Sequence, residues 1–160
     1  MHPPFHDRWG DAVNTADKTP HIEPRSGAWL VLVSKGCVLL TYPNFAPDIA
    51  DLPGGGIDSG ETAKQAALRE LTEETGLTLP SDSDVQKSHR QTVNFYADDV
   101  DKFWIYQQEF FLISTAIDSL YFKGRRQTPE GDCQWVDIKT LPAHPINAAH
   151  KKALQALSII

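Results

Sequence analysis

The chain has 160 residues, of which 41% are hydrophobic and 22% charged, and its net charge at pH 7 is −6. These values are typical of one globular domain with a sizeable core, and the negative charge argues against a surface that wraps duplex nucleic acid. No run approaches the roughly 18 apolar residues of a membrane span, and the start, MHPPFHDRWGD, lacks the apolar segment of a signal peptide. Cys37 and Cys133 are too few for a disulfide framework. We therefore expect a cytoplasmic protein with reduced thiols and no membrane partner.

The first part of the chain predicts an arm followed by a hairpin. Residues 1–25 are polar and contain prolines, so we expect an extended or partly ordered arm. From residue 26 the pattern changes, because residues 28–33 and 37–42 are apolar, β-prone runs separated by a short polar turn. A loop then leads to a short strand at residues 49–52, which we expect to deliver the glycine-rich stretch that follows.

Residues 52–77 read LPGGGIDSGETAKQAALRELTEETGL. The glycines at 54, 55 and 56 can bring bare backbone close to a ligand, because glycine has no Cβ and reaches positive φ without strain. Ser59 or Thr62 can cap the helix that follows, and Gly76 is a natural residue for its C-terminal cap. We predict a helix over residues 62–75.

Three glutamates gather on one face of this predicted helix. At about 100° of rotation per residue, Glu70, Glu73 and Glu74 fall within an arc of roughly 100°, whereas Leu68 and Leu71 point elsewhere. Like charges at this spacing repel, and the helix C-terminal end disfavours anions. A hard cation such as Mg²⁺ or Mn²⁺ would reverse the balance, because it binds carboxylate oxygens and leaves positions for water and phosphate. The pattern therefore indicates a phosphate and divalent-metal site.

Beyond the helix the chain alternates again between polar and apolar stretches. We predict strands at residues 92–96, 103–113 and 133–138, and a closing amphipathic helix over residues 147–157 with Asn147 as its N-cap. The order of strands, helix, strands and helix favours an α/β fold with a mixed sheet between helices.

The stretch around the glutamates resembles the Nudix box, G-x5-E-x7-R-E-U-x-E-E-x-G-U, where U is aliphatic. Every fixed position is filled, by Gly55, Glu61, Arg69, Glu70, Leu71, Glu73, Glu74, Gly76 and Leu77. The resemblance implies a single Nudix domain over residues 1–160, with an α/β/α sandwich and a mixed central sheet. It also implies hydrolysis of a pyrophosphate bond in a nucleoside diphosphate linked to another moiety, with Mg²⁺ or Mn²⁺ as cofactor.

The resemblance further assigns roles to the residues of the box. Glu70, Glu73 and Glu74 would hold the metal, with the Gly54 carbonyl as a further ligand. Arg69 and Glu61 would form an ion pair that fixes the loop against the helix. The glycines at 54, 55 and 56 would contact a small-molecule, nucleotide-type substrate.

The resemblance leaves the general base open, because Nudix enzymes place it either in the box or on a later loop. The later candidates are Glu130 and Asp132, with Glu109 third, and each can equally be a plain solvated residue. We take Glu130 as the leading accessory acid.

Substrate identity is also open. Asn147 begins the last helix roughly where MutT-like members place an asparagine that reads a purine, but as a helix cap it needs no ligand. Many members carry phosphate-gripping arginines after the hairpin strand, whereas this chain has Tyr42 and Pro43 there. A Nudix-fold domain that binds a nucleotide or regulates without turnover is the alternative function, although none of the box acids is missing. Whether the chain forms a homodimer stays open.

Overall fold

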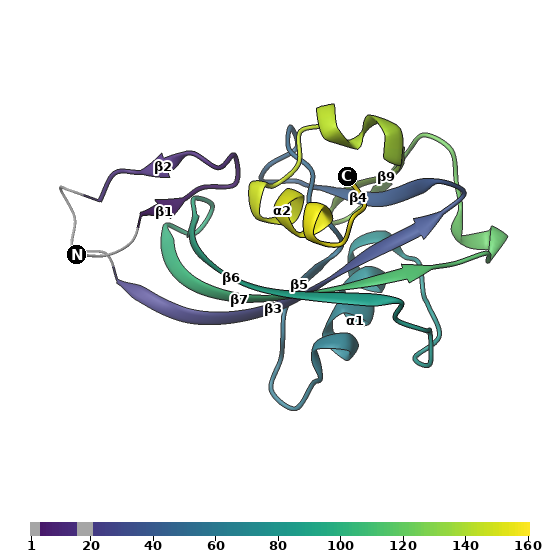
Figure 1. Cartoon of the computed structure of the whole chain (residues 1–160), viewed down its shortest axis with the longest axis horizontal. Helices are drawn as coiled ribbons and strands as arrows, with labels where there is room; N and C mark the ends of the chain where they lie inside the picture. Colours follow the sequence, from purple (N-terminus) through teal and green to yellow (C-terminus); the bar gives the residue numbers. More distant parts are fainter. Residues whose placement is uncertain (1–3, 16–20) are drawn as a thin grey trace.

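The computed structural model describes residues 4–15 and 21–160 and shows a curved mixed sheet with a helix on each face (Figure 1). The strands are β1 (Phe5–His6), β2 (Ala12–Val13), β3 (Ile22–Ser34), β4 (Cys37–Pro43), β5 (Gly54–Gly56), β6 (Lys87–Ala97), β7 (Lys102–Ser114), β8 (Arg125–Thr128) and β9 (Gly131–Asp137). The helices are α1 (Ala63–Thr75) and α2 (Ala148–Ala156), with short 3-10 helices η1 (Asp118–Leu120) and η2 (Ile138–Ala143). Among the described residues, no helix is long and apolar enough to cross a membrane.

The strand order is β2-β1-β6-β7-β3-β4-β9-β8, and β5 pairs with β3 beside this path. The pairs β1/β6 and β3/β7 are parallel and the others are antiparallel. Helix α1 lies on one face, and α2 with η2 lies on the other (Figure 1). The α/β/α sandwich with a mixed sheet that the sequence predicts is therefore confirmed.

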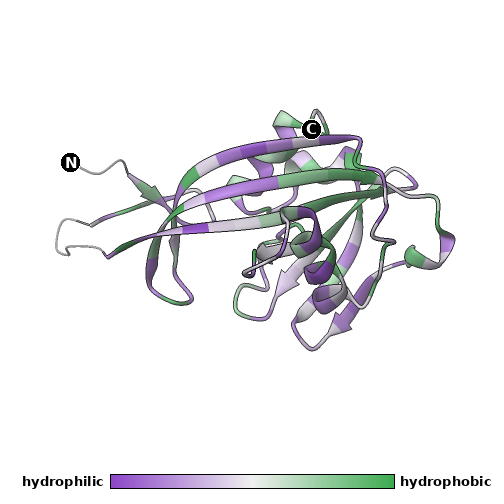
Figure 2. Cartoon of the chain, turned by 90° about the horizontal axis from the view of Figure 1, so that it is seen from below, coloured by the Kyte–Doolittle hydropathy of each residue, from purple (hydrophilic) through white to green (hydrophobic). Residues whose placement is uncertain are grey.

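The two hydrophobic cores follow from the alternation of side chains along β3. Leu30 faces α1 and packs in a cluster with Leu71, whereas Trp29 faces α2 and packs in a cluster with Leu154. Seen from the α1 side, the long strands carry hydrophilic stretches where they run beyond the helix (Figure 2). Helix α1 is thus fixed against one part of the sheet, next to β5.

The N-terminal prediction was wrong in its extent. Strand β3 begins at Ile22, within the segment expected to be an extended or partly ordered arm, and residues 5–13 of that segment form a small hairpin of β1 and β2. The hairpin is held because Phe5 is buried edge-on against Phe103, with 5.2 Å between ring centroids. The Arg8 carbonyl also accepts a hydrogen bond from Ala148 N at 2.9 Å. Residues 1–3 and 16–20, the rest of the predicted arm, lie outside the described residues.

Two other strand predictions need correction, and one strand was missed. Residues 49–52 form only isolated bridges, Thr41 with Asp51 and Ala50 with Ile146, and the glycine segment itself is the strand β5. Strand β6 begins earlier than predicted, at Lys87. The short strand β8 was not predicted at all, because its polar sequence has no strand pattern, and it forms by pairing with β9.

Candidate active site

The glycine segment forms β5, which pairs with β3 and contacts α1. Gly54 has no room for a side chain, because a Cβ there would lie 2.3 Å from the carbonyl oxygen of Ala28. A Cβ at Gly55 would come within 3.0 Å of the Glu70 carboxyl group. The backbone N–H of Gly54 donates to Oε1 of Glu74 at 2.7 Å. The glycines therefore let β5 lie directly against the acidic face of the helix.

Local sequence fixes both ends of α1. The Thr62 hydroxyl accepts from Gln65 N at 3.1 Å, and the Gln65 side chain accepts from Thr62 N at 2.9 Å, so these residues form a capping box. Gly76 ends the helix with φ 76°, a conformation that glycine adopts without strain. Of the two predicted caps, Thr62 rather than Ser59 is the one used.

Arg69 ties the helix to the loop that precedes it. Its Nε donates to Glu61 Oε2 at 2.8 Å, and its Nη2 donates to the Gly56 carbonyl at 3.1 Å. Its Nη1 contacts Glu70 Oε1 at 3.0 Å and Glu73 Oε2 at 3.2 Å. The hydrogen bond from Arg69 is the main reason that the pKa of Glu61 is lowered. The ion pair expected between Arg69 and Glu61 is thus present, and Arg69 also holds Glu73.

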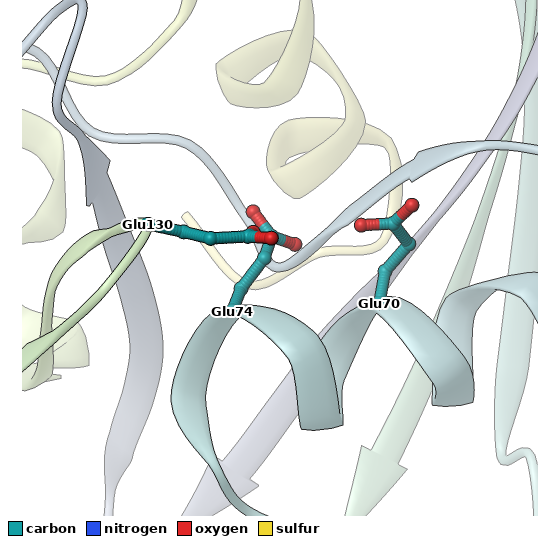
Figure 3. Close-up of side chains that lie close together, drawn as sticks. All are labelled: Glu70, Glu74 and Glu130. Carbon is teal, nitrogen blue, oxygen red and sulfur yellow. The ribbon is translucent and has the colours of Figure 1, made fainter.

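Three carboxylates meet beside β5. One oxygen each of Glu70, Glu74 and Glu130 lie within 4.8 Å of one another. Glu70 and Glu74 lie one turn apart on α1, and Glu130 reaches toward them from the turn between β8 and β9 (Figure 3). Glu73, although in the same predicted ligand set, is turned to Arg69. The fold therefore gathers two of the three glutamates of the expected ligand set together with the leading accessory acid.

The electrostatics of this group favour a bound cation. Burial raises the pKa of Glu74 well above its usual range, the Gly54 N–H opposes this rise, and nearby carboxylates including Glu70 add to it. Burial also raises the pKa of Glu70, with Arg69 opposing. Crowded, partly buried carboxylate oxygens are the donor set that Mg²⁺ and Mn²⁺ take. The residues present fit a divalent metal ion.

A cavity of about 290 Å³ opens beside these acids. Glu70, Glu74 and all three glycines of β5 line it, and its far wall comes from the N-terminal hairpin, β7 and α2. The other lining residues are Arg8, Arg25, Trp29, Pro43, Phe45, Asp51, Phe95, Ala97, Asp99, Trp104, Tyr106, Gln108, Asn147 and His150.

The two other accessory acids are engaged elsewhere. Asp132 lies 3.5 Å from Arg125, and Glu109 lies 3.2 Å from Arg90 on the neighbouring strand. Like Glu130, neither of them lines the cavity of about 290 Å³. Glu130 alone of the three candidates joins Glu70 and Glu74.

Asn147 does cap α2, because its Oδ1 accepts from Ala149 N at 3.1 Å. Its Nδ2 donates to Asp51 Oδ1 at 3.0 Å, and the residue is buried in the cavity wall. Asp51 in turn forms an ion pair with Arg8 of the N-terminal hairpin. The predicted role of Asn147 as the N-cap of α2 is thus confirmed. One hydrogen of its amide remains for a ligand.

A sequence model of the NUDIX domain matches residues 23–157. The chain belongs to the Nudix family. It is 40% identical over 50 residues to a Bacillus subtilis protein whose name gives it provisionally as an 8-oxo-dGTP diphosphatase. That segment covers 31% of this chain and 34% of the relative.

Solved structures of Nudix proteins have the same fold. A MutT NUDIX hydrolase from Burkholderia pseudomallei aligns with a TM-score of 0.56 and 24% identity, over 83% of this chain and 97% of that one. A bifunctional NMN adenylyltransferase/ADP ribose pyrophosphatase from Francisella tularensis, complexed with AMP and a Mn ion, aligns with a TM-score of 0.62 and 19% identity. That alignment covers 87% of this chain and 42% of the other.

One departure from many Nudix members has a structural counterpart. At the end of β4, where the resemblance leads one to expect arginines, the Tyr42 ring is covered by the Arg125 guanidinium at 4.0 Å from its centroid. Arg125 also pairs with Asp132. The cation near this position therefore comes from β8 and is already held by a ring and a carboxylate.

Several residues of the site were not predicted from the sequence. Arg8, Arg25, Asp51 and His150 all line the cavity, yet none belongs to a motif. Arg8 lies in the predicted arm, and the docking of the N-terminal hairpin through Phe5 and through the Arg8 carbonyl places it beside Asp51. The His150 spacing on α2 was the one usable signal, since it lies on the same helix face as Leu154 and Leu157.

His150 is held neutral beneath the cavity. Its Nδ1 accepts from Leu52 N at 3.0 Å, and its ring packs against Trp29 at 5.0 Å. Burial lowers its pKa to about 4, with Asp51 opposing and Arg8 adding to the fall. The backbone hydrogen bond requires an unprotonated Nδ1, which agrees with the neutral form.

His150 should therefore make the protein less stable in acid. The folded state binds its proton less readily than the unfolded chain, so stability is full above pH 6.5 and is lost as the pH falls toward 4. The full loss would be about 3 kcal/mol in the free energy of unfolding. Urea unfolding at pH 7 and pH 4.5 should show most of this loss of unfolding free energy in the native chain and little of it in His150→Gln. The glutamine side chain can still accept a hydrogen bond from Leu52 N. Equal losses in both proteins would contradict the assignment.

Proposed function

We propose that this Nudix protein is a divalent-metal-dependent pyrophosphohydrolase that cleaves a nucleoside diphosphate linked to another moiety. The observation that carries the proposal is the meeting of Glu70, Glu74 and Glu130, the first two of which line a cavity beside the glycine strand. A surface cluster of acids would need neither the cavity nor the strand. Mg²⁺ or Mn²⁺ is the cofactor that this donor set suits.

In this proposal Glu70 and Glu74 hold the metal. Glu73 and the Gly54 carbonyl are further ligands expected from the family resemblance. A bound divalent ion neutralises charge on the phosphate oxygens and lowers the pKa of its water. Arg69 keeps the ligand set in place, because it bonds Glu70 and Glu73 and also the Gly56 carbonyl.

Glu130 serves as the general base that takes a proton from the attacking water. Its position supports the role, because it comes from a turn, is exposed, and reaches the other two acids from a segment outside α1 (Figure 3). Among the described residues, no cationic side chain lies within 4 Å of its carboxylate, in contrast to Asp132 and Glu109. The carboxylate is therefore free to accept the proton.

The rest of the cavity suits a nucleotide. Phe45 lines it, and the ring face that Arg8 leaves uncovered can stack on a base. The backbone of the three glycines approaches the phosphates. Asn147 contributes its remaining amide hydrogen to the substrate, while Asp51 offers a carboxylate oxygen beside it.

A substrate panel tests the proposal. Release of phosphate or nucleoside monophosphate is measured with dNTPs, oxidised dNTPs, ADP-ribose, dinucleoside polyphosphates, nucleotide sugars and coenzyme A, each with Mg²⁺ and with Mn²⁺. We expect turnover of at least one class that stops when EDTA removes the metal. Turnover unaffected by EDTA would contradict the metal site. Nucleotide binding without any turnover would instead favour the binding or regulatory alternative.

A further inference from the structure

The carboxylates that line the cavity repel an anionic substrate, so the substrate needs positive charge from elsewhere in the lining. Glu70, Glu74, Asp51 and Asp99 all contribute carboxylates, and a metal ion at the acidic end serves only the phosphate oxygens within its reach. The remaining charge of a pyrophosphate needs a cationic side chain. The lining offers two arginines, Arg8 and Arg25.

Arg8 is already committed. Its Nη1 forms an ion pair with Asp51, its guanidinium lies 5.0 Å from the Phe45 ring centroid, and the side chain is only 10% exposed. Together, Arg8 and Asp51 carry no net charge. Arg8 is therefore a weak attractor for a phosphate.

Arg25 differs in that no carboxylate lies within ion-pair distance of it among residues 4–15 and 21–160. Its guanidinium carbon lies 4.3 Å from the Trp104 ring centroid, and its Nε donates to the Tyr106 hydroxyl at 3.2 Å. These contacts hold the side chain from one side by ring stacking and by a neutral acceptor. The contacts fix the orientation of the Arg25 guanidinium but do not neutralise its positive charge.

The position of Arg25 relative to the acids is also defined. A Cβ at Gly56 would lie 3.1 Å from Arg25 Nη2, so the guanidinium rests against the glycine strand. The opposite end of that strand donates to Glu74 through Gly54 N. A diphosphate lying along β5 would thus have the carboxylate-bound metal at one end and Arg25 at the other.

We propose that Arg25, oriented by Trp104, is the residue that binds the substrate phosphate lying farther from the carboxylates. The inference rests on the proposed function for its substrate class, a diphosphate. It also accounts for the end of β4, where Tyr42 and Pro43 replace the expected arginines and Arg125 is held by Asp132. In this chain the phosphate-binding cation comes from β3 instead.

The test compares Arg25→Gln with the matched control Arg90→Gln. Arg90 is an exposed arginine on β6 that pairs with Glu109 outside this cavity, and such a surface pair contributes little to stability. Two readouts are used, KM for a turned-over substrate and the dissociation constant of imidodiphosphate with Mg²⁺ by titration calorimetry. A charge-assisted hydrogen bond corresponds to about a 10-fold to 100-fold change in affinity.

We expect Arg25→Gln to raise both constants by that factor and to lower kcat less. Arg25→Lys should recover part of the loss, and Arg90→Gln should change neither constant. Because Arg25 is exposed, the melting temperature should stay close to the native value in all three variants.

The outcomes separate this inference from the proposed function. If the native protein turns over a nucleotide and Arg25→Gln keeps its KM and its affinity for imidodiphosphate, the role of Arg25 is overturned and the hydrolase stands. If the native protein turns over nothing but binds imidodiphosphate through Arg25, the phosphate site stands and the hydrolase fails. If the native protein binds no imidodiphosphate with Mg²⁺ and turns over nothing, both fail.

Discussion

Glu74→Gln is expected to reduce turnover by more than about 100-fold and, in metal-free protein, to raise stability. The loss of turnover follows because a residue that merely supports a metal ligand already costs 10-fold to 100-fold when removed. The gain in stability follows from burial, which makes the ionised Glu74 carboxylate unfavourable in the folded state. A glutamine keeps an oxygen that can accept the Gly54 N–H.

The pH dependence of this gain has a definite sign. The folded state binds the Glu74 proton more tightly than the unfolded chain, so the stability of the native protein falls as the pH rises above the unfolded pKa. The melting temperature of Glu74→Gln should therefore exceed that of the native chain at pH 7.5 in EDTA, and the difference should shrink toward pH 4.5.

Adding metal should make the melting temperature of the native protein higher than that of Glu74→Gln. Millimolar Mg²⁺ or Mn²⁺ raises the melting temperature of the native protein by linkage, and Glu74→Gln should gain much less. Glu109→Gln serves as the control, because that carboxylate lies on β7 next to Arg90, away from the cavity. Equal metal-induced shifts in the native chain and Glu74→Gln would show that Glu74 holds no metal.

The parts of the site that sequence could predict are those fixed within about twenty residues. The choice of Ser59 or Thr62 as the helix cap, the C-terminal glycine at Gly76 and the acidic face of α1 follow from residue type and spacing. The Arg69–Glu61 pair joins two residues of the same motif. These interactions are local, so the chain's pattern contains them.

The parts that sequence could not predict depend on contacts between distant segments. Arg8 reaches the cavity because Phe5 docks on Phe103 and the Arg8 carbonyl bonds Ala148 N, and Arg25 is oriented by Trp104 across the β3/β7 pairing. Neither contact has a spacing that a single sequence could reveal. Such residues become visible only when the sheet is assembled.

Strand β6 shows the same limit within the fold itself. Its first half is polar and gives no strand signal, yet Gln91 donates to both Gln108 Oε1 and the Ala149 carbonyl, at 2.9 and 2.8 Å. A polar residue can occupy the face toward α2 once its hydrogen bonds are satisfied there. The pattern of hydrophobic residues cannot anticipate this, because the partners come from β7 and α2.

Glu130→Gln is expected to lower kcat by about 100-fold to 10,000-fold, the usual contribution of a general base. The amide keeps the shape of the side chain but cannot take the proton of the attacking water. If Glu130 acts as the base, the acid limb of the pH profile of kcat/KM should disappear, while the metal-induced rise in melting temperature should largely remain. If Glu130 is instead a metal ligand, kcat and the metal-induced rise should fall together.

Asp132→Asn is the matched control for this variant. Asp132 lies two residues away and is also a carboxylate. It forms an ion pair with Arg125 and does not belong to the group of Glu70, Glu74 and Glu130. Its replacement should change kcat by no more than a few-fold. A larger loss in Asp132→Asn than in Glu130→Gln would move the base to Asp132.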